Sequence, residues 1–382
     1  MDILFIILLI LLINTYMIKA LSNRFNIASE GYLWAMFIIH FLLSSAYMIY
    51  AAYTTSDSIA YYAKTAASEQ WLPLWGIGTP FVHFFAWPFA GLLDLSYYAT
   101  MIIFSYLGYV AVVLFYITAK ENIQLRPFWK NFTAVEMVFL LPNLHFWSSS
   151  LGKGSLILFG LAYFTYGLSR FNRRLIPLVI GGFLTFMIRP HILFTVILSI
   201  MLGVIITSSG IRPILRWAIF LVAGIVFIYI SDDVLKFADT ESIDIMSSSS
   251  ISHRAEELSK ATSGVNIQDY GLFMKMFTFW FRPLFFEGKG ALGIAVSFEN
   301  LLYIYMFIIV IKEGIFSWGD WNGWFRICLF IFLFGSFALA QVTGNLGIAM
   351  RQKAQFMPFF FIIYCKAVSY KYYVNKKLAA GY

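Results

Sequence analysis

The sequence predicts an all-α protein that is embedded in a membrane as a polytopic bundle of transmembrane helices. Three observations support this class: the composition, a series of apolar runs, and the distribution of charged residues. The chain has 382 residues, of which 60% are hydrophobic and 12% charged, and its mean hydropathy is +0.78. Soluble domains carry about 25% charged residues. The composition therefore excludes an ordinary water-soluble enzyme, a disordered chain and a disulfide-stapled secreted domain, and the two cysteines, Cys328 and Cys365, both lie inside apolar runs.

Eleven apolar runs predict the transmembrane spans. A helix needs roughly 20 mostly apolar residues to cross about 30 Å of hydrocarbon. We expect all the spans to form a single transmembrane domain over residues 1–382. The first run lacks a basic flank before it and a small-residue cleavage site, so it is predicted as a retained anchor. The predicted spans are 3–19, 32–52, 98–119, 132–150, 155–169, 175–188, 191–208, 214–231, 297–311, 325–343 and 354–369.

Three further segments are predicted to lie outside the spans. The segment 75–95 is apolar but is broken by glycines and prolines in its first half, so we predict a re-entrant or interfacial hairpin inside an external loop at 53–97. The stretch 270–286 is aromatic and interrupted by charged residues, which is typical of a helix along the membrane surface. Residues 232–296 are predicted as one long external loop with amphipathic segments, and loops of that length are usually functional or disordered.

The charges indicate an orientation. With the N-terminus outside and the C-terminus in the cytoplasm, 16 of the 27 lysines and arginines fall on the cytoplasmic side, against four of the 19 acidic residues. This is the positive-inside bias of inserted helix bundles. The net charge of +8 is therefore interpreted as an orientation signal, and no nucleic-acid partner is predicted.

Asp57 is the candidate catalytic residue. It follows the second predicted span, with hydroxyls and tyrosines beside it, and its carboxylate could act as a general base on a hydroxyl. The alternative role is that of a helix N-cap for residues 60–67. Both roles are compatible with the same position.

Seven side chains on the predicted external face are candidates for binding an anionic phosphate. Cations in short external turns run against the positive-inside preference, which suggests an anionic ligand. Arginine binds phosphate oxygens in a bidentate way, and a lysine in a flexible turn ahead of a helix N-terminus suits an anion. The alternatives are lipid-head-group or interfacial anchors, an ordinary turn, or a solvated lid face. The seven are Lys153, Arg189, His191, Arg254, Arg282, Arg351 and Lys353.

The remaining polar residues suggest packing roles. His40 and His83 are predicted as satisfied core or interfacial residues. Glu136, nine residues before His145, is an intramembrane carboxylate, and it is either a functional residue or half of a structural pair inside the bundle. No spacing supports a zinc site, a Ser-His-Asp triad or a nucleotide-binding loop. No cofactor is predicted, and the spacing gives no support for a divalent metal.

Together these residues resemble a family. A many-span chain with an Asp57-x-x-x-Tyr61 element in its first external loop resembles the GT-C superfamily of integral-membrane glycosyltransferases and the related O-antigen and exopolysaccharide polymerases of bacteria. The Arg189-Pro190-His191 turn, the Phe281-Arg282-Pro283 element and Arg351 are similar to the external-loop arginines of those polymerases. The chain departs from the pattern in two ways. Typical GT-C proteins place the acidic motif after the first span, whereas Asp57 follows the second predicted span. Many of the polymerases carry two long external loops, whereas this chain is predicted to have one.

The resemblance implies an activity and a location. Such proteins transfer sugars from polyprenyl phosphate or diphosphate carriers, on the extracytoplasmic face of the bacterial cytoplasmic membrane. By this resemblance Asp57 would be the base, and the partners would be the lipid-linked glycan donor and acceptor, membrane lipids and other polysaccharide-assembly proteins. The aromatic side chains of Tyr61, Trp71 and Trp75 could stack on sugar faces. A flippase or transporter of lipid-linked sugars and a non-catalytic membrane subunit are the alternative functions.

Overall fold

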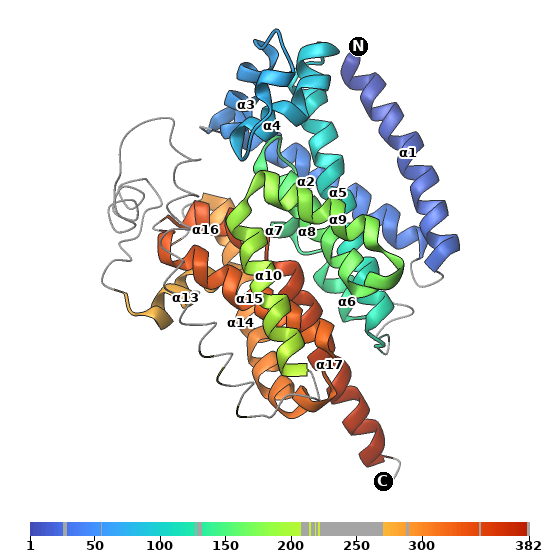
Figure 1. Ribbon diagram of the computed structural model, residues 1–382, viewed down its shortest axis with the longest axis vertical. Coiled ribbons are helices and arrows are strands. Elements are labelled where there is room, and N and C mark those ends of the chain that lie inside the picture. Colours follow the sequence, from blue (N-terminus) through green and yellow to red (C-terminus); the bar gives the residue numbers. More distant parts are fainter. Residues whose placement is uncertain are drawn as a thin grey trace. The chain divides into compact units, whose positions relative to one another are not determined.

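The computed structural model is helical in every regular element that it describes (Figure 1). It describes residues 1–25, 29–54, 56–125, 127, 132–207, 270–287, 290–343 and 345–379, together with the isolated residues 214, 218 and 221. The predicted span 214–231, most of the predicted loop 232–296 and the candidate Arg254 lie outside these residues. The all-helical class predicted from the composition is confirmed.

The described chain forms two compact units. Unit 1 consists of residues 1–124 and 135–190, and unit 2 of residues 125–134 and 191–382. The elements in the first half of the chain are α1 (Asp2–Phe25), α2 (Glu30–Tyr53), α3 (Asp57–Ala66), the 3-10 turn η1 (Leu72–Leu74), α4 (Thr79–Trp87), the π-helical turn η2 (Pro88–Leu92), α5 (Tyr97–Asn122), α6 (Ala134–Val138), α7 (Pro142–Trp147), α8 (Lys153–Ser169), η3 (Phe171–Arg173) and α9 (Leu175–Ile188).

The second half of the chain supplies the longest helix and the C-terminal helices. Helix α14 has 28 residues. The elements are α10 (Pro190–Thr207), α13 (Leu272–Phe281), α14 (Gly290–Ser317), η4 (Trp318–Asp320), α15 (Gly323–Val342), α16 (Leu346–Lys353) and α17 (Met357–Ala379).

Six helices of the described residues are long and apolar enough to cross a membrane, by length and composition. Several of them also expose large apolar side chains. Leu4, Leu8 and Leu12 of α1 are 58–69% exposed, and this exposed apolar surface suits contact with lipid. The chain is therefore described as a helical membrane protein. The six segments are Asp2–Phe25, Glu30–Tyr53, Tyr97–Asn122, Pro190–Thr207, Gly293–Gly314 and Gly323–Gln341.

Two predicted segments differ in detail from the helices observed. The predicted span 132–150 is not continuous: it is divided into α6 and α7, of five and six residues, and Pro142 begins the second. Proline lacks the N–H that would continue a helix and clashes with the preceding turn. The segment 75–95 contains α4 and η2 in direct succession over 79–92, which is shorter than the roughly 20 residues of a span. Whether it re-enters the membrane remains a prediction.

Helices α8 and α9 pack with their backbones in close approach. Three glycines make this contact, and a Cβ on any of them would overlap the other helix. At Gly181 it would lie 2.3 Å from the Phe164 N, and at Gly167 it would lie 2.4 Å from the Leu178 N. At Gly160 it would lie 2.9 Å from Thr185 Oγ1. Small residues at such contacts are typical of helix pairs in membranes, where close van der Waals packing drives association.

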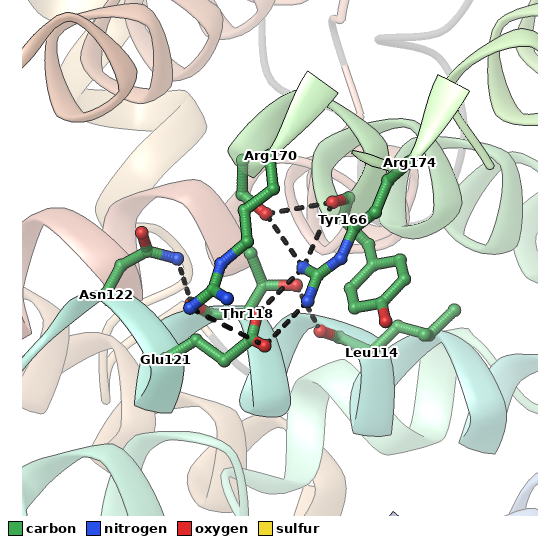
Figure 2. Close-up of polar contacts among 8 residues, drawn as sticks. Leu114, Thr118, Glu121, Asn122, Tyr166, Arg170 and Arg174 are labelled. Atoms are coloured by element: carbon green, nitrogen blue, oxygen red, sulfur yellow. Dashed lines mark hydrogen bonds and ion pairs between the residues drawn. The ribbon is translucent and has the colours of Figure 1, made fainter. Parts of the chain in front are cut away.

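A buried ion pair ties the start of α9 to α5. Figure 2 shows Arg174 and Arg170 directed at Glu121. Arg174 Nη1 and Nη2 donate to Glu121 Oε2 and Oε1 at 2.7 and 2.6 Å, while Arg170 stands 3.9 Å away. The Arg174 guanidinium also lies 3.8 Å from the centre of the Tyr166 ring. This bidentate geometry is the strongest form of ion pair available to an arginine, and it fixes the α5, α8 and α9 ends together.

Candidate functional site

Helix α3 carries the first group of candidate residues. Its N-cap is Ser56, whose hydroxyl accepts from the Ser58 N, so Asp57 is the first helical residue and does not itself cap the helix. Asp57, Tyr61 and Lys64 follow at intervals of four and three residues and therefore share one face of the helix. Asp57 and Lys64 are exposed, and Tyr61 is half-buried.

His83 of α4 faces this helix. The side chain is 3% exposed, and its Nδ1 lies 2.8 Å from Thr65 Oγ1. Its ring packs edge-on against Tyr61, with 5.7 Å between the ring centres. Burial lowers the pKa of His83, and the charge of Lys64 and the more weakly acting charge of Lys153 lower it further, against the raising effect of a hydrogen bond to the Tyr61 backbone. His83 is therefore held neutral beside two cations.

The turn before α8 brings Lys153 to the same place. Gly152 has a φ of 149°, which favours glycine, and a Cβ there would lie 3.0 Å from the Tyr61 ring. The turn therefore packs directly on α3. Lys153, the first residue of α8, is 8% exposed. We define the α3–α4 cluster as Asp57, Tyr61, Lys64, His83 and Lys153.

Trp71 and Trp75 form an aromatic surface on the segment that leads to α4. The Trp71 ring stacks on Phe84 at 4.8 Å and 15°, and its Nε1 donates to the Phe84 O at 2.8 Å. Trp75 meets Phe84 edge-on at 4.9 Å. The two tryptophans remain 40% and 52% exposed. They are thus rigidly held and still accessible, as a sugar-stacking surface requires.

Arg189 is the C-cap residue of α9, whose last turn is hydrogen-bonded to the start of α4. The Gly78 N, which begins α4, donates to the Met187 O at 2.7 Å, and Arg189 follows two residues later. Its own N–H donates to the Thr185 O and closes α9. Unit 1 therefore gathers Asp57, Tyr61 and Lys153 into the α3–α4 cluster, and it places Trp71, Trp75 and Arg189 on segments that flank α4.

The candidate cations of unit 2 are arranged differently. Lys353 is 1% exposed, and its Nζ donates to Asn300 Oδ1 at 2.5 Å and to the Trp280 O at 3.1 Å. Arg282 forms an ion pair with Glu287 at 2.5 Å. Asn300 Nδ2 in turn donates to the Pro283 O at 2.8 Å. The structure thus uses Lys353 to join α13, α14 and α16, and we leave it out of the proposed phosphate site.

Arg351 and His191 both lie in unit 2, and their role in binding a phosphate stays a prediction. Arg351 is half-buried in the last turn of α16, whose N-cap Asn345 accepts from the Gly347 and Ile348 N–H groups. His191 is the second residue of α10 and is half-buried. Neither belongs to unit 1, so neither enters the α3–α4 cluster.

The polar residues inside the bundle form two separate pairs. Glu136 is buried and pairs with Lys120 Nζ at 2.8 Å, and Tyr116 donates to the same carboxylate oxygen at 2.9 Å. Of the two roles predicted for Glu136, the structural pair is the one observed. His145 does not meet Glu136; its Nδ1 lies 3.0 Å from His40 Nδ1, and both rings are fully buried.

Sequence reasoning missed the central position of His83. His83 is buried, as predicted for a core or interfacial residue, and it also contacts Tyr61 and Thr65 of the helix that carries the candidate Asp57. The available signal was weak: a single histidine in the aromatic helix 79–87, and Tyr61, Lys64 and Thr65 grouped on one side of α3. No short-range spacing connects the two helices. In the described part of the chain, no group of three or more His, Cys, Asp or Glu residues could hold a metal ion.

Known proteins give no further guidance, because no protein-family model, curated protein or solved structure matches this chain.

Proposed function

We propose that this protein transfers a glycosyl group from a polyprenyl phosphate or diphosphate carrier to a growing cell-surface polysaccharide. One observation carries the proposal. The α3–α4 cluster combines two lysines, a neutral histidine and a carboxylate within unit 1, and two exposed tryptophans lie on the adjoining segment. This reaction needs cations that bind an anionic leaving group, a side chain that accepts a proton, and an aromatic surface on which the sugar stacks.

Each part has a role in the proposed reaction. The carrier lipid stays in the bilayer and presents its phosphate at the membrane surface. Lys64 and Lys153 stabilise the charge that develops on the phosphate as the glycosidic bond breaks, which is the largest effect available in many active sites. Trp71 and Trp75 hold the pyranose rings by stacking. The activated carrier linkage supplies the energy, so the reaction requires no nucleotide.

The proposed location follows from the charge distribution. With the N-terminus outside, the segment 53–97 faces the extracytoplasmic side of a bacterial cytoplasmic membrane, where lipid-linked sugars are polymerised. Lysines on the external side are disfavoured by the positive-inside rule. Binding an anionic carrier would explain why Lys64 and Lys153 lie there.

Complementation tests the proposal. In a strain lacking the gene, we expect the wild-type chain to restore surface polysaccharide and to prevent accumulation of polyprenyl-linked saccharides in lipid extracts. Lys153→Ala should reduce polymer to about one-hundredth, because removing one positioned donor to a developing anion costs about 100-fold. Lys312→Ala, an exposed lysine on α14, is the matched control and should behave as wild type. Unchanged polymer in the deletion strain would contradict the proposed function.

A second candidate, transport of the lipid-linked sugar across the membrane, is favoured by one observation. His40 lies in α2, one of the helices long and apolar enough to cross a membrane, and it forms a fully buried pair with His145. Ionisable residues inside a membrane often mark proton pathways. Under this function, His40→Gln would abolish polymer while Lys153→Ala would not, and lipid-linked saccharides would accumulate on the cytoplasmic leaflet.

A further inference from the structure

We propose that His83 Nε2 is the general base that removes the proton from the acceptor hydroxyl. The inference rests on the proposed function and assigns a catalytic role to a histidine that was predicted only as a core or interfacial residue. The evidence is the hydrogen-bond pattern around the imidazole ring, which shows which ring nitrogen carries the proton.

The hydrogen bonds assign the tautomer of His83. Thr65 Oγ1 lies 2.7 Å from the Tyr61 O, to which its single hydroxyl proton is donated. The same oxygen lies 2.8 Å from His83 Nδ1 and must therefore accept from that nitrogen. The Tyr61 carbonyl has no proton of its own to give, so the Thr65 hydroxyl is the donor in that contact. The proton of neutral His83 thus belongs on Nδ1, and the lone pair is left on Nε2.

The second nitrogen is available for chemistry. Nε2 makes no hydrogen bond with any described residue, and it is not among the fully enclosed polar atoms that lack a partner. It therefore keeps some access to a ligand although the side chain as a whole is 3% exposed. A fixed tautomer with an accessible lone pair is the requirement for a histidine base.

The surrounding charges keep this base unprotonated. The ionisable groups that face His83 are Lys64 and Tyr61 of α3 and Lys153 of α8. Both lysines disfavour an imidazolium ion. Once an anionic phosphate binds to them, their effect is reduced, so the ring becomes a better proton acceptor when the donor substrate is in place.

The acceptor hydroxyl oxygen forms a bond to the anomeric carbon of the donor sugar while its proton moves to His83 Nε2. The bond between that carbon and the phosphate oxygen breaks, and the electron pair leaves with the polyprenyl phosphate or diphosphate. The imidazolium ion then releases its proton to water or to the departing phosphate. Asp57, exposed at the start of α3, is not needed as the base.

A measurement that does not depend on activity tests the tautomer. In purified protein labelled with ¹⁵N-histidine, we expect His83 to titrate with a pKa below its ordinary value of 6.5 and, when neutral, to carry its proton on Nδ1. His83→Gln assigns the signal. Lys64→Ala should raise the pKa of His83, since a nearby positive charge is removed, whereas Lys312→Ala should not. A neutral His83 protonated on Nε2 would overturn the inference.

Complementation tests the catalytic role. His83→Gln should lower polymer synthesis by about 100-fold to 10,000-fold, the usual contribution of a general base, at normal protein levels and with lipid-linked saccharides accumulating. Thr65→Val should lose much of the activity and Thr65→Ser should retain it, because only serine keeps the hydroxyl that orients the ring. Wild-type polymer from His83→Gln would overturn this role, and it would leave the proposed function standing if Lys153→Ala still loses polymer. Normal polymer in the deletion strain would instead remove the proposed function itself.

Discussion

The two buried cations that the structure describes most fully are stabilised in different ways. Arg174 meets the carboxylate of Glu121 in a bidentate pair, so its charge is cancelled directly. Lys353 donates to two neutral acceptors, Asn300 and the Trp280 carbonyl. An uncharged amine still has two hydrogens for these two acceptors. Arg174 therefore depends on its charge, whereas Lys353 can satisfy its partners without one.

Removing one half of the Arg174 pair should be strongly destabilising. Arg174→Ala leaves Glu121 buried without its main partner, which costs about 3–5 kcal/mol in typical buried pairs. We expect a lower midpoint of thermal unfolding in detergent. The double variant Arg174→Met with Glu121→Leu should recover most of the loss, because an apolar pair leaves no buried charge. Equal losses from the single and double variants would contradict this account.

Lys353 should make the stability depend on pH. Burial lowers the pKa of Lys353 from 10.5 to about 7. Between these two values the unfolded chain binds more protons than the folded chain, so the free energy of unfolding rises with pH, by at most about 1.4 kcal/mol per unit. Below about pH 7 both states are protonated and this dependence disappears.

The check for Lys353 is a series of unfolding curves between pH 7 and pH 9. The wild type should gain stability over this range, and Lys353→Met should show a flatter profile. Lys312→Ala, which alters an exposed lysine of the same unit, should keep the wild-type slope. An unchanged slope in Lys353→Met would show that another group is responsible.

Among the elements, the α8–α9 pair shows how the helices of unit 1 are fitted together. Glycines allow a backbone approach that no larger residue permits. Individual long apolar helices could be predicted from the sequence because length and hydropathy suffice. The close pairing could not be predicted, since glycines also occur in exposed helical positions such as Gly31, where an added Cβ would meet no other part of the protein within 4 Å. The interruption at 132–150 was missed because Pro142 stands in an otherwise apolar run.

Adjacent glycines of α9 provide a matched test of the α8–α9 contact. Gly181→Ala would place a Cβ 2.3 Å from the Phe164 N, so we expect a loss of about 1–3 kcal/mol, the usual cost of overpacking. At Gly182 a Cβ would meet the Phe164 ring at an ordinary 3.5 Å. Gly182→Ala should be neutral or slightly stabilising, because alanine favours the helix. Unfolding midpoints in detergent would distinguish the two, and equal effects would contradict the proposed packing.

At the scale of the whole molecule, composition settled the class and charge suggested a direction. The exposed apolar side chains and the six long helices found among the described residues agree with a membrane protein. The candidate site was harder to predict. Asp57, Tyr61 and Lys153 were selected from their sequence surroundings, but the contact between His83 and Thr65 forms only when α3 and α4 pack together. A single sequence does not reveal contacts between residues so far apart. The described chain forms two compact units, and the single transmembrane domain over residues 1–382 stays a prediction.

The orientation can be measured directly. Reporter fusions after Arg174 and after Tyr382 should give a cytoplasmic signal, and a fusion after Ser250 should give an extracytoplasmic one, because the basic residues concentrate on the inner side. Alkaline phosphatase and green fluorescent protein, which are active on opposite sides, make the assignment independent of expression level. The reverse pattern would move the α3–α4 cluster to the cytoplasm and exclude a reaction at the outer surface.

Helix α9 is held at both ends, and this has a mechanical consequence. Its first residue follows Arg174, which is fixed to Glu121, and its last turn accepts the Gly78 N–H through Met187. Fourteen helical residues extend about 21 Å, so α9 rigidly connects the Glu121 ion pair to the N-terminus of α4. We expect a disturbance at the ion pair to be transmitted along α9 to α4, the helix that carries His83, as a change in the tilt of α4.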